Sequence, residues 1–289
     1  MTLHTFRFGT VGSPTSTPKK PGGSVGAIFR IAEMGLSALE LGWVQSVRVT
    51  EKTCAEIRLA AEGQDVHISV HAPYFFNLNA NDEEWPKSRK RLMDAAHYGH
   101  LAGATDIIFH PGSYFGQPPE QVLPGAIERL EACVQELRQA GNPAFLRPET
   151  MGKSAMLGSF EDTLEMSRAI AGVSPCLDFA HLHARPGDGS MNTYDEWRRL
   201  LEAYGNALGD QALASLHIHL SGIEYGAKGE KEHLPIEEAD LDLKALFRAL
   251  YDFNCRGRIL CESPVLEDDA LKMQALWAEV SGMGQSSPG

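Results

Sequence analysis

The stretch "HISVHAP" at residues 67–73 is matched farther along the chain by "DIIFHPG" at residues 106–112. In both, a short apolar run rich in β-branched residues ends in a histidine and is closely followed by a proline. Runs of this length and composition are typical of strands buried on both faces, as in parallel sheets. The two stretches therefore predict buried strands that each present a polar side chain where the strand ends.

Similar apolar runs recur about every 30 to 40 residues along the chain. The predicted strands cover residues 6–12, 37–44, 67–72, 106–112, 143–150, 174–181, 215–222 and 257–264. Stretches of helical period lie between them, for example residues 125–141, 194–208 and 241–253, and Gly35, Gly103 and Gly141 are placed as helix terminators. This alternation predicts an α/β fold, a single-domain (β/α)8 TIM barrel, with an open doubly wound sheet as the alternative.

The composition suits one barrel domain at residues 1–280 and a flexible tail at 281–289, "SGMGQSSPG". With 43% apolar and 22% charged residues, the chain resembles soluble globular proteins. No run approaches the roughly 18 apolar residues of a membrane span, and the first residues do not resemble a signal peptide. We therefore expect a cytoplasmic protein without membrane association. The five cysteines show no metal-binding spacing and are expected to be reduced and buried.

The formal net charge of −12 argues against broad, sequence-independent binding to nucleic acid, which depends on Lys and Arg. It leaves room for a local positive site, especially where bound cations supply charge. The densest basic cluster, "WPKSRKRL" at 85–92, is expected to form a solvated helix face, with a phosphate-facing edge as the alternative.

Six of the eight predicted strands end in a side chain that can bind a metal, namely His71, His110, Glu149, Asp178, His219 and Glu262. The carboxyl ends of all strands of a barrel converge on one face, where active sites form. Each residue alone could be structural, but six at one topological position predict a shared site. Three imidazoles and three carboxylates suit Zn²⁺, with Mn²⁺ or Fe²⁺ as substitutes, and could hold two or three ions.

Asp178 and His181 form D-x-x-H, so two ligands can come from one strand end. Clustered ions stabilise both oxygens of a phosphoryl displacement, so these residues predict a hydrolase acting on phosphate esters. Glu149 is the predicted catalytic residue, orienting the attacking water. Tyr74 is a candidate substrate-binding residue that could stack on a nucleotide or only roof the barrel, and Ser113 in "HPGS" could approach a phosphate.

His217 and His219 compete for one ligand position, because both point to the same side of an extended strand. His219 lies nearer the carboxyl end and is the predicted ligand, which leaves His217 as a supporting or core residue.

Several motifs, in this order over nearly the whole chain, resemble the endonuclease IV family of apurinic/apyrimidinic endonucleases: "SVHAPYFFNL", "IIFHPGSY", "RPETMGK", "CLDFAH", "HLSG" and "ILCESP". The segment "GIEYG…GEK.HLP" at 222–235 is similar to a divergent, archaeal-like branch. The resemblance implies a TIM barrel with zinc ions that cleaves DNA on the 5′ side of abasic sites during base excision repair. It also implies abasic DNA as the partner, with no obligate protein partner and a monomeric state.

The resemblance further implies how three ions would be held. The first would use His71, His110 and Glu149. Glu149 would bridge to a second ion, completed by Asp178, His219 and Glu262. The third would use His181 and His233.

This chain departs from the family in two places. An Asp two residues before the last histidine helps to hold the third ion in better-known members, but Lys231 stands at that position here and Glu230 is the expected substitute. The loop after the second strand, "ELGWVQSVRVT", also lacks the family's Arg-, Gln- and Asn-rich segment that inserts into DNA.

The main alternative is a divalent-metal sugar isomerase or epimerase of the same barrel superfamily. Such enzymes place Glu, Asp, His and Glu on successive strand ends, and Glu149, Asp178, His219 and Glu262 would serve equally well. The additional histidines favour the nuclease. A non-catalytic barrel that binds a partner is a third, weaker interpretation, because no predicted ligand is replaced by an inert residue.

Overall fold

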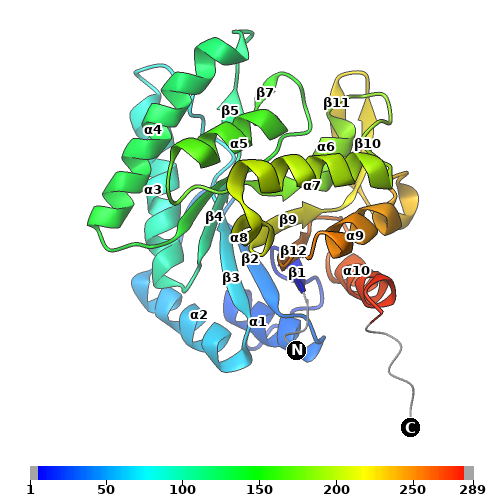
Figure 1. Cartoon of the computed structure of the whole chain (residues 1–289). Coiled ribbons are helices and arrows are strands. Elements are labelled where there is room, and N and C mark those ends of the chain that lie inside the picture. The colour runs from blue at the N-terminus through cyan, green and yellow to red at the C-terminus, as the bar shows by residue number, and fades with distance from the viewer. Residues whose placement is uncertain (1–5, 283–289) are drawn as a thin grey trace.

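A barrel of eight parallel strands forms the centre of the computed structural model, which describes residues 6–282 (Figure 1). The strands are β1 (Phe6–Val11), β2 (Ala38–Gly42), β3 (His67–His71), β4 (Asp106–Phe109), β6 (Phe145–Pro148), β8 (Cys176–Asp178), β9 (Leu216–Leu220) and β12 (Gly257–Cys261). Their order is β6-β4-β3-β2-β1-β12-β9-β8. Parallel bridges join Leu146 to Val173 and Glu149 to Cys176, so β6 also meets the β8 segment. The predicted (β/α)8 TIM barrel is therefore confirmed.

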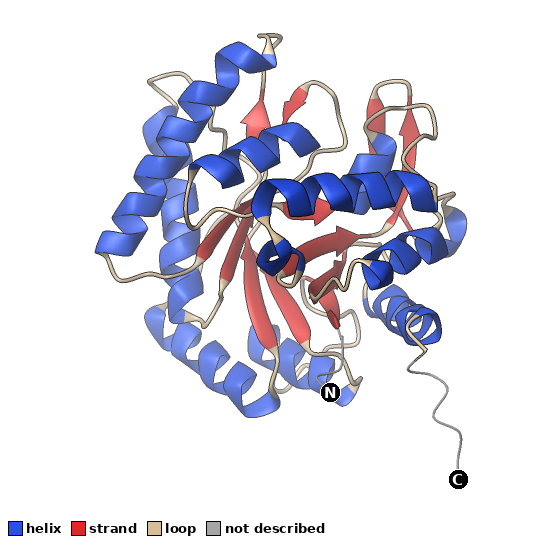
Figure 2. Cartoon of the chain, in the orientation of Figure 1, coloured by secondary structure: helices blue, strands red, loops and turns tan. Residues whose placement is uncertain are grey.

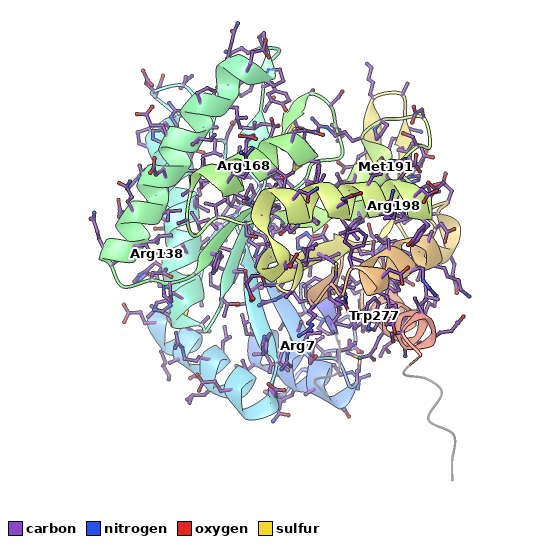
Figure 3. The ribbon with its side chains drawn as sticks, in the orientation of Figure 1. Arg7, Arg138, Arg168, Met191, Arg198 and Trp277 are labelled. Carbon is purple, nitrogen blue, oxygen red and sulfur yellow. The ribbon has the colours of Figure 1, made fainter. Side chains whose placement is uncertain are left out.

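Helices surround the strands on the outside (Figure 2). They are α1 (Gly23–Glu33), α2 (Glu51–Gln64), α3 (Trp85–Leu101), α4 (Pro119–Gln139), α5 (Phe160–Ala169), α6 (Phe179–Ala184), α7 (Tyr194–Leu208), α8 (Asp210–Leu213), α9 (Leu243–Asp252) and α10 (Glu267–Val280), with a 3-10 turn at Ile236–Glu238. Their apolar faces pack on the barrel. For example, Trp277 of α10, which is labelled in Figure 3, meets the ring of Phe6 edge-on with the ring centroids 4.9 Å apart. No helix among residues 6–282 is both long and apolar enough to span a membrane.

All eight predicted strands form, and the predicted helix at 194–208 has the observed bounds of α7. Several boundaries were wrong: the strands predicted over 106–112 and 257–264 end at Phe109 and Cys261, and the helix predicted over 125–141 begins at Pro119. The strand predicted over 174–181 ends at Asp178, because the Asp178 carboxylate accepts the His181 amide proton at 2.7 Å and so caps α6. His181 therefore lies on the first turn of a helix. Of the predicted tail, residues 283–289 lie outside the described part of the chain.

Two short antiparallel pairs stand above the carboxyl ends of the barrel strands, and neither was predicted. β5 (Gly112–Ser113) pairs with β7 (Met156–Leu157), and β10 (Gly222–Gly226) pairs with β11 (Gly229–Leu234). Gly112 is required because its φ is +124° and a Cβ there would lie 2.0 Å from Asn77 Oδ1. This close approach joins the loop after β4 to the loop after β3.

Charged side chains close the opposite, amino-terminal end of the barrel. The buried carboxylate of Asp106 pairs with Arg147 and, at 2.9 Å, with Arg258. Arg147 also donates to the carbonyl oxygens of Pro175 and Ser215, both at 3.1 Å. A depression of about 940 Å³ lies here. Because its charged groups satisfy one another, we assign this end to stability. The five cysteines are free and buried, as predicted.

Candidate metal centre

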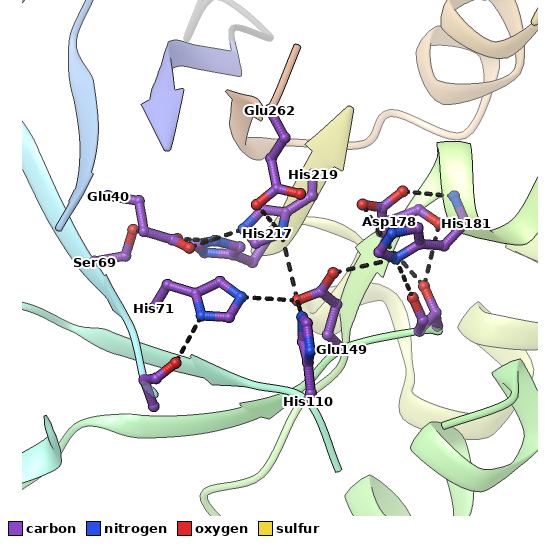
Figure 4. Close-up of polar contacts among 12 residues, drawn as sticks. Glu40, Ser69, His71, His110, Glu149, Asp178, His181, His217, His219 and Glu262 are labelled. Atoms are coloured by element: carbon purple, nitrogen blue, oxygen red, sulfur yellow. Dashed lines mark hydrogen bonds and ion pairs between the residues drawn. The ribbon is translucent and has the colours of Figure 1, made fainter. Parts of the chain in front are cut away.

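The six side chains predicted from strand ends come together at the carboxyl face of the barrel (Figure 4). His71 and Asp178 are the last residues of β3 and β8, and His219 lies one residue before the end of β9. His110, Glu149 and Glu262 each follow directly after a strand. All but His110 and Glu262 are essentially buried. Barrel closure therefore unites residues up to 191 positions apart in the chain (His71 to Glu262).

The carboxylate of Glu149 lies at the centre of this group and is fully buried. Its Oε2 atom is 3.2 Å from Nε2 of His71 and 3.4 Å from Nε2 of His110. On the other side, Oε1 lies 3.2 Å from Nδ1 of His181. The ligand atoms of His71, His110 and Glu149 all lie within 4.8 Å of one another. One carboxylate therefore faces two separate groups of possible ligands.

A second group shares Glu149 and consists of side chains from three further strands. The ligand atoms of Glu149, Asp178, His219 and Glu262 lie within 4.8 Å of one another. Nδ1 of His219 is 3.4 Å from Oε1 of Glu262 and 3.7 Å from Oε2 of Glu149. His219, and not His217, therefore faces the carboxylates of this second group.

A third group lies beside α6 and contains Asp178, His181 and His233, again within 4.8 Å. Nε2 of His181 is 3.3 Å from Nε2 of His233 and 3.7 Å from Oε2 of Glu230. His233 and Glu230 both come from β11, which leans over the site as part of the β10–β11 hairpin. Glu230, which was the expected substitute for Lys231, therefore lies beside this group.

A β-bulge in β11 explains how the candidate ligand can be Glu230 when the expected position is that of Lys231. In the β10–β11 ladder, Glu224 pairs with Glu232 and the next residue, Tyr225, pairs with Glu230, which leaves Lys231 as the extra residue. A bulge re-aims the side chains of the strand that contains it. Lys231 pairs instead with Glu224 at 2.7 Å on the exposed surface, while Glu230 approaches His181.

Most of these histidines have one ring nitrogen engaged by a backbone carbonyl. Nδ1 of His71 lies 2.9 Å from Ala72 O, and Nδ1 of His181 lies 3.0 Å from Thr150 O. Nδ1 of His233 lies 3.2 Å from Glu262 O. A carbonyl can only accept, so each Nδ1 donates to it, and Nε2 is the nitrogen of each ring that is left to face the site. This is the arrangement that metal-binding histidines adopt.

The electrostatics of the site are dominated by crowded carboxylates. Burial alone would raise the pKa of Glu149, but His110 and His219 outweigh it and hold that pKa well below its ordinary value. Burial also raises the pKa of Asp178, and His181 offsets this only partly. Burial opposes the charge of His181, yet Asp178 and Glu149 raise its pKa to about 10. The buried carboxylates therefore require positive charge next to them.

Several buried polar atoms of the site have no hydrogen-bonding partner among the described residues: Glu149 Oε1, Asp178 Oδ2 and His219 Nδ1. Leaving such groups unpaired is costly, and a cation would satisfy all three. The donors are imidazole nitrogens and carboxylate oxygens, the set that suits Zn²⁺ and Mn²⁺. The residues present therefore fit a divalent-metal centre.

The mouth of the site is a cavity of about 310 Å³, lined by Tyr74, His110, Lys153, His181, Glu230, His233 and Glu262 among others. Tyr74 is about half exposed, and its ring stacks on His110 with centroids 4.9 Å apart. Lys153 lies on a loop held by Arg185, which donates to the carbonyl oxygens of Met151, Lys153 and Met156. Ser113 does not line this cavity, and its hydroxyl donates to Ala155 O at 3.3 Å.

Glu40 on β2 is a buried site residue that was not predicted from the sequence. Its Oε2 accepts from Ser69 Oγ at 2.8 Å and from Nε2 of His217 at 2.9 Å, and its Oε1 lies 3.0 Å from Nε2 of His219. Burial would raise the pKa of Glu40, but His219 and His217 outweigh it and lower that pKa. A carboxylate inside the apolar run "SALELGWV" was the available signal.

Comparison with known proteins agrees with this fold. The profile of the xylose isomerase-like TIM barrel family matches residues 28–280. The chain belongs to this family. It is 34% identical to an uncharacterised protein of Methanocaldococcus jannaschii, over 94% of this chain and 97% of that protein. This archaeal similarity agrees with the predicted divergent branch.

Two solved structures are similar over nearly the whole chain. Endonuclease IV from Thermus thermophilus superposes with a TM-score of 0.70 and 25% identity, over 94% of this chain and 99% of that chain. A D-tagatose 3-epimerase-like protein superposes with a TM-score of 0.71 and 20% identity, over 96% and 99%. The predicted resemblance to endonuclease IV is confirmed, while the second similarity shows the shared fold.

Proposed function

We propose that this protein is a divalent-metal-dependent phosphodiesterase that cleaves DNA on the 5′ side of abasic sites. The observation that carries the proposal is the extent of the candidate metal centre. Two histidine-containing groups flank the quartet of Glu149, Asp178, His219 and Glu262, one on either side. A phosphoryl displacement benefits from more than one ion, because charge develops on both the attacking and the leaving oxygen. The similarity to endonuclease IV supports the same reaction.

Divalent ions, zinc for preference, would lower the pKa of water and stabilise the negative charge of the transition state. Glu149 faces both the His71 and the His181 side, so its carboxylate can orient the attacking water. Tyr74 presents a half-exposed ring at the mouth, suited to packing against a sugar or base beside the lesion. Lys153 lines the same cavity and supplies a cationic partner for a phosphate.

A sugar isomerase or epimerase is the second candidate, because the quartet alone could hold the single ion that such a reaction uses. The similarity in fold to a D-tagatose 3-epimerase-like protein is compatible with it. A single-ion isomerase has no use for His71, His110 and His233. Their convergence on the quartet is the reason for preferring the nuclease.

The deciding experiment incubates the purified protein with a duplex that contains one synthetic abasic site, with and without prior chelation. Elemental analysis of the same sample gives the ions per chain. We expect chelator-sensitive incision on the 5′ side of the lesion and two or three ions per chain. One ion per chain, an intact duplex and turnover of ketose sugars would overturn the proposal in favour of the isomerase.

A further inference from the structure

Glu40 is a buried carboxylate beneath the candidate metal centre, on a strand that contributes no ligand to it. It is fully buried and is surrounded by Ser69, His217 and His219 (Figure 4). Burying a charged group is unfavourable unless it is paired, so its partners carry information about its role. Two of these partners account for only one of its oxygens.

Oε2 of Glu40 is already saturated, because it accepts from Ser69 Oγ and from Nε2 of His217. Oε1 has no aligned hydrogen bond, and neither does Nε2 of His219, which lies 3.0 Å away. Each of these two atoms is therefore the hydrogen-bonding partner that the other lacks. The carboxylate can only accept, so the proton belongs on Nε2 of His219.

His219 differs from the other candidate ligands in which nitrogen faces the site. His71, His181 and His233 each have Nδ1 next to a backbone carbonyl and direct Nε2 toward the ligand groups. In His219 the ring is reversed, so that Nδ1 lies 3.4 Å from Glu262 and Nε2 points down to Glu40. No backbone carbonyl pairs with that ring among the described residues, and Glu40 takes its place.

We propose that Glu40 is a positioning residue that holds His219 in the tautomer protonated on Nε2, leaving Nδ1 to bind the ion of the Glu149–Asp178–Glu262 group. The inference rests on the proposed metal centre. A carboxylate partner also makes an imidazole a stronger metal ligand than a carbonyl does. Glu40 thereby links the barrel interior to the group that shares Glu149 and Asp178 with the other two groups.

The two histidines near Glu40 could instead belong to a separate metal site, and the test has to distinguish that role from the proposed one. Cys176, His217 and His219 also place their ligand atoms within 4.8 Å of one another, deep in the barrel. A metal bound there through Nε2 of His219 would exclude the proton that the proposal places on this nitrogen. The two arrangements therefore predict opposite states of the same nitrogen.

The test measures zinc affinity by competition with a chromophoric chelator, without any nucleic acid. Glu40→Gln is expected to weaken binding of one ion about 10–100-fold, the usual effect of removing such a partner. Ser69→Ala is the matched control, because it removes one hydrogen bond from Oε2 of Glu40 and leaves Oε1 opposite His219. Cys176→Ala is likewise expected to keep its zinc. Equal affinity in Glu40→Gln and the native protein would overturn the proposal, as would loss of zinc in Cys176→Ala.

Nitrogen NMR of the histidine rings in the zinc-loaded native protein provides a reading that does not depend on any variant folding. We expect a protonated Nε2 and a metal-bound Nδ1 for His219, and a proton on Nδ1 would refute the inference. Both measurements concern zinc alone. A protein that passes them yet leaves abasic DNA intact would contradict the proposed function and leave the role of Glu40 standing.

Discussion

The Nε2 atoms of His181 and His233 lie 3.3 Å apart, although 52 residues separate the two histidines in the chain. Because Nδ1 of each ring faces a backbone carbonyl, the two Nε2 atoms are left to share a proton or to bind a cation. Two lone pairs at this distance repel unless a proton or a cation lies between them. The carboxylate of Glu230, 3.7 Å from His181, favours a cation there.

Replacing Glu230 with Gln should therefore weaken the binding of an ion between His181 and His233. We expect the zinc content to fall by up to one ion per chain after dialysis against a weak chelator, measured by elemental analysis. Lys231→Ala is the matched control from the same bulge, because Lys231 forms only an exposed pair with Glu224. If Lys231→Ala loses the ion and Glu230→Gln keeps it, the assignment of Glu230 is wrong.

Replacing Glu149 with Gln should abolish most hydrolysis while the barrel still folds. The amide keeps the shape of the side chain but carries no negative charge to balance the facing histidines or to orient the attacking water. We expect incision of abasic DNA to slow by at least about 100-fold, measured under single-turnover conditions. Glu165→Gln, at an exposed position on α5, should incise at the native rate. Near-native incision by Glu149→Gln would exclude the catalytic role.

The amino-terminal end of the barrel should contribute stability without affecting metal binding. Asp106→Asn would leave the buried Arg147 and Arg258 without a counter-charge. The free energy of unfolding in urea should fall by about 3–5 kcal/mol, with unchanged zinc content. Asp65→Asn, which breaks the exposed pair with Arg7, should cost less than about 1 kcal/mol. Similar losses in the two variants would contradict this view of the buried cluster.

Glu267 should make stability depend on pH in the acid range. Its carboxylate accepts from Thr15 N, Thr15 Oγ1 and Ser16 N at 2.8–2.9 Å. Burial opposes ionisation, but these hydrogen bonds and that of its own amide outweigh it and lower the pKa from 4.5 to about 2. A lowered pKa contributes stability that is complete above pH 4.5 and is lost as the pH falls toward 2.

Glu267→Gln should accordingly be less stable than the native protein by about 2 kcal/mol at pH 7, and the difference should shrink between pH 4.5 and pH 2. Urea unfolding of both proteins across this range measures it. Taking the difference between the two cancels the titration of the shared metal-site residues. A difference that stays constant down to pH 2 would show that the charge of Glu267 is unimportant.

The local sequence pattern was sufficient to predict the architecture and most residues of the candidate site. Buried parallel strands are continuous apolar runs, and a polar residue that ends such a run must lie at the carboxyl face once the barrel closes. His71, His110, Glu149, Asp178, His219 and Glu262 were found in this way, and the structure brings all six together.

The sequence by itself determined the barrel and the convergence of these strand ends, because both follow from the order of apolar runs along the chain. Only the tertiary structure decided three details. The bulge at Lys231 turns Glu230 toward His181, the cap by Asp178 places His181 on a helix, and Glu40 meets His217 across 177 residues. The contacts of Glu40 with His217 and of Glu230 with His181 join segments that become neighbours only on folding, and such contacts leave no periodic signal in the sequence. The Asp178 cap is local, but the apolar run around it continues into α6 and gives no sign of where the strand ends.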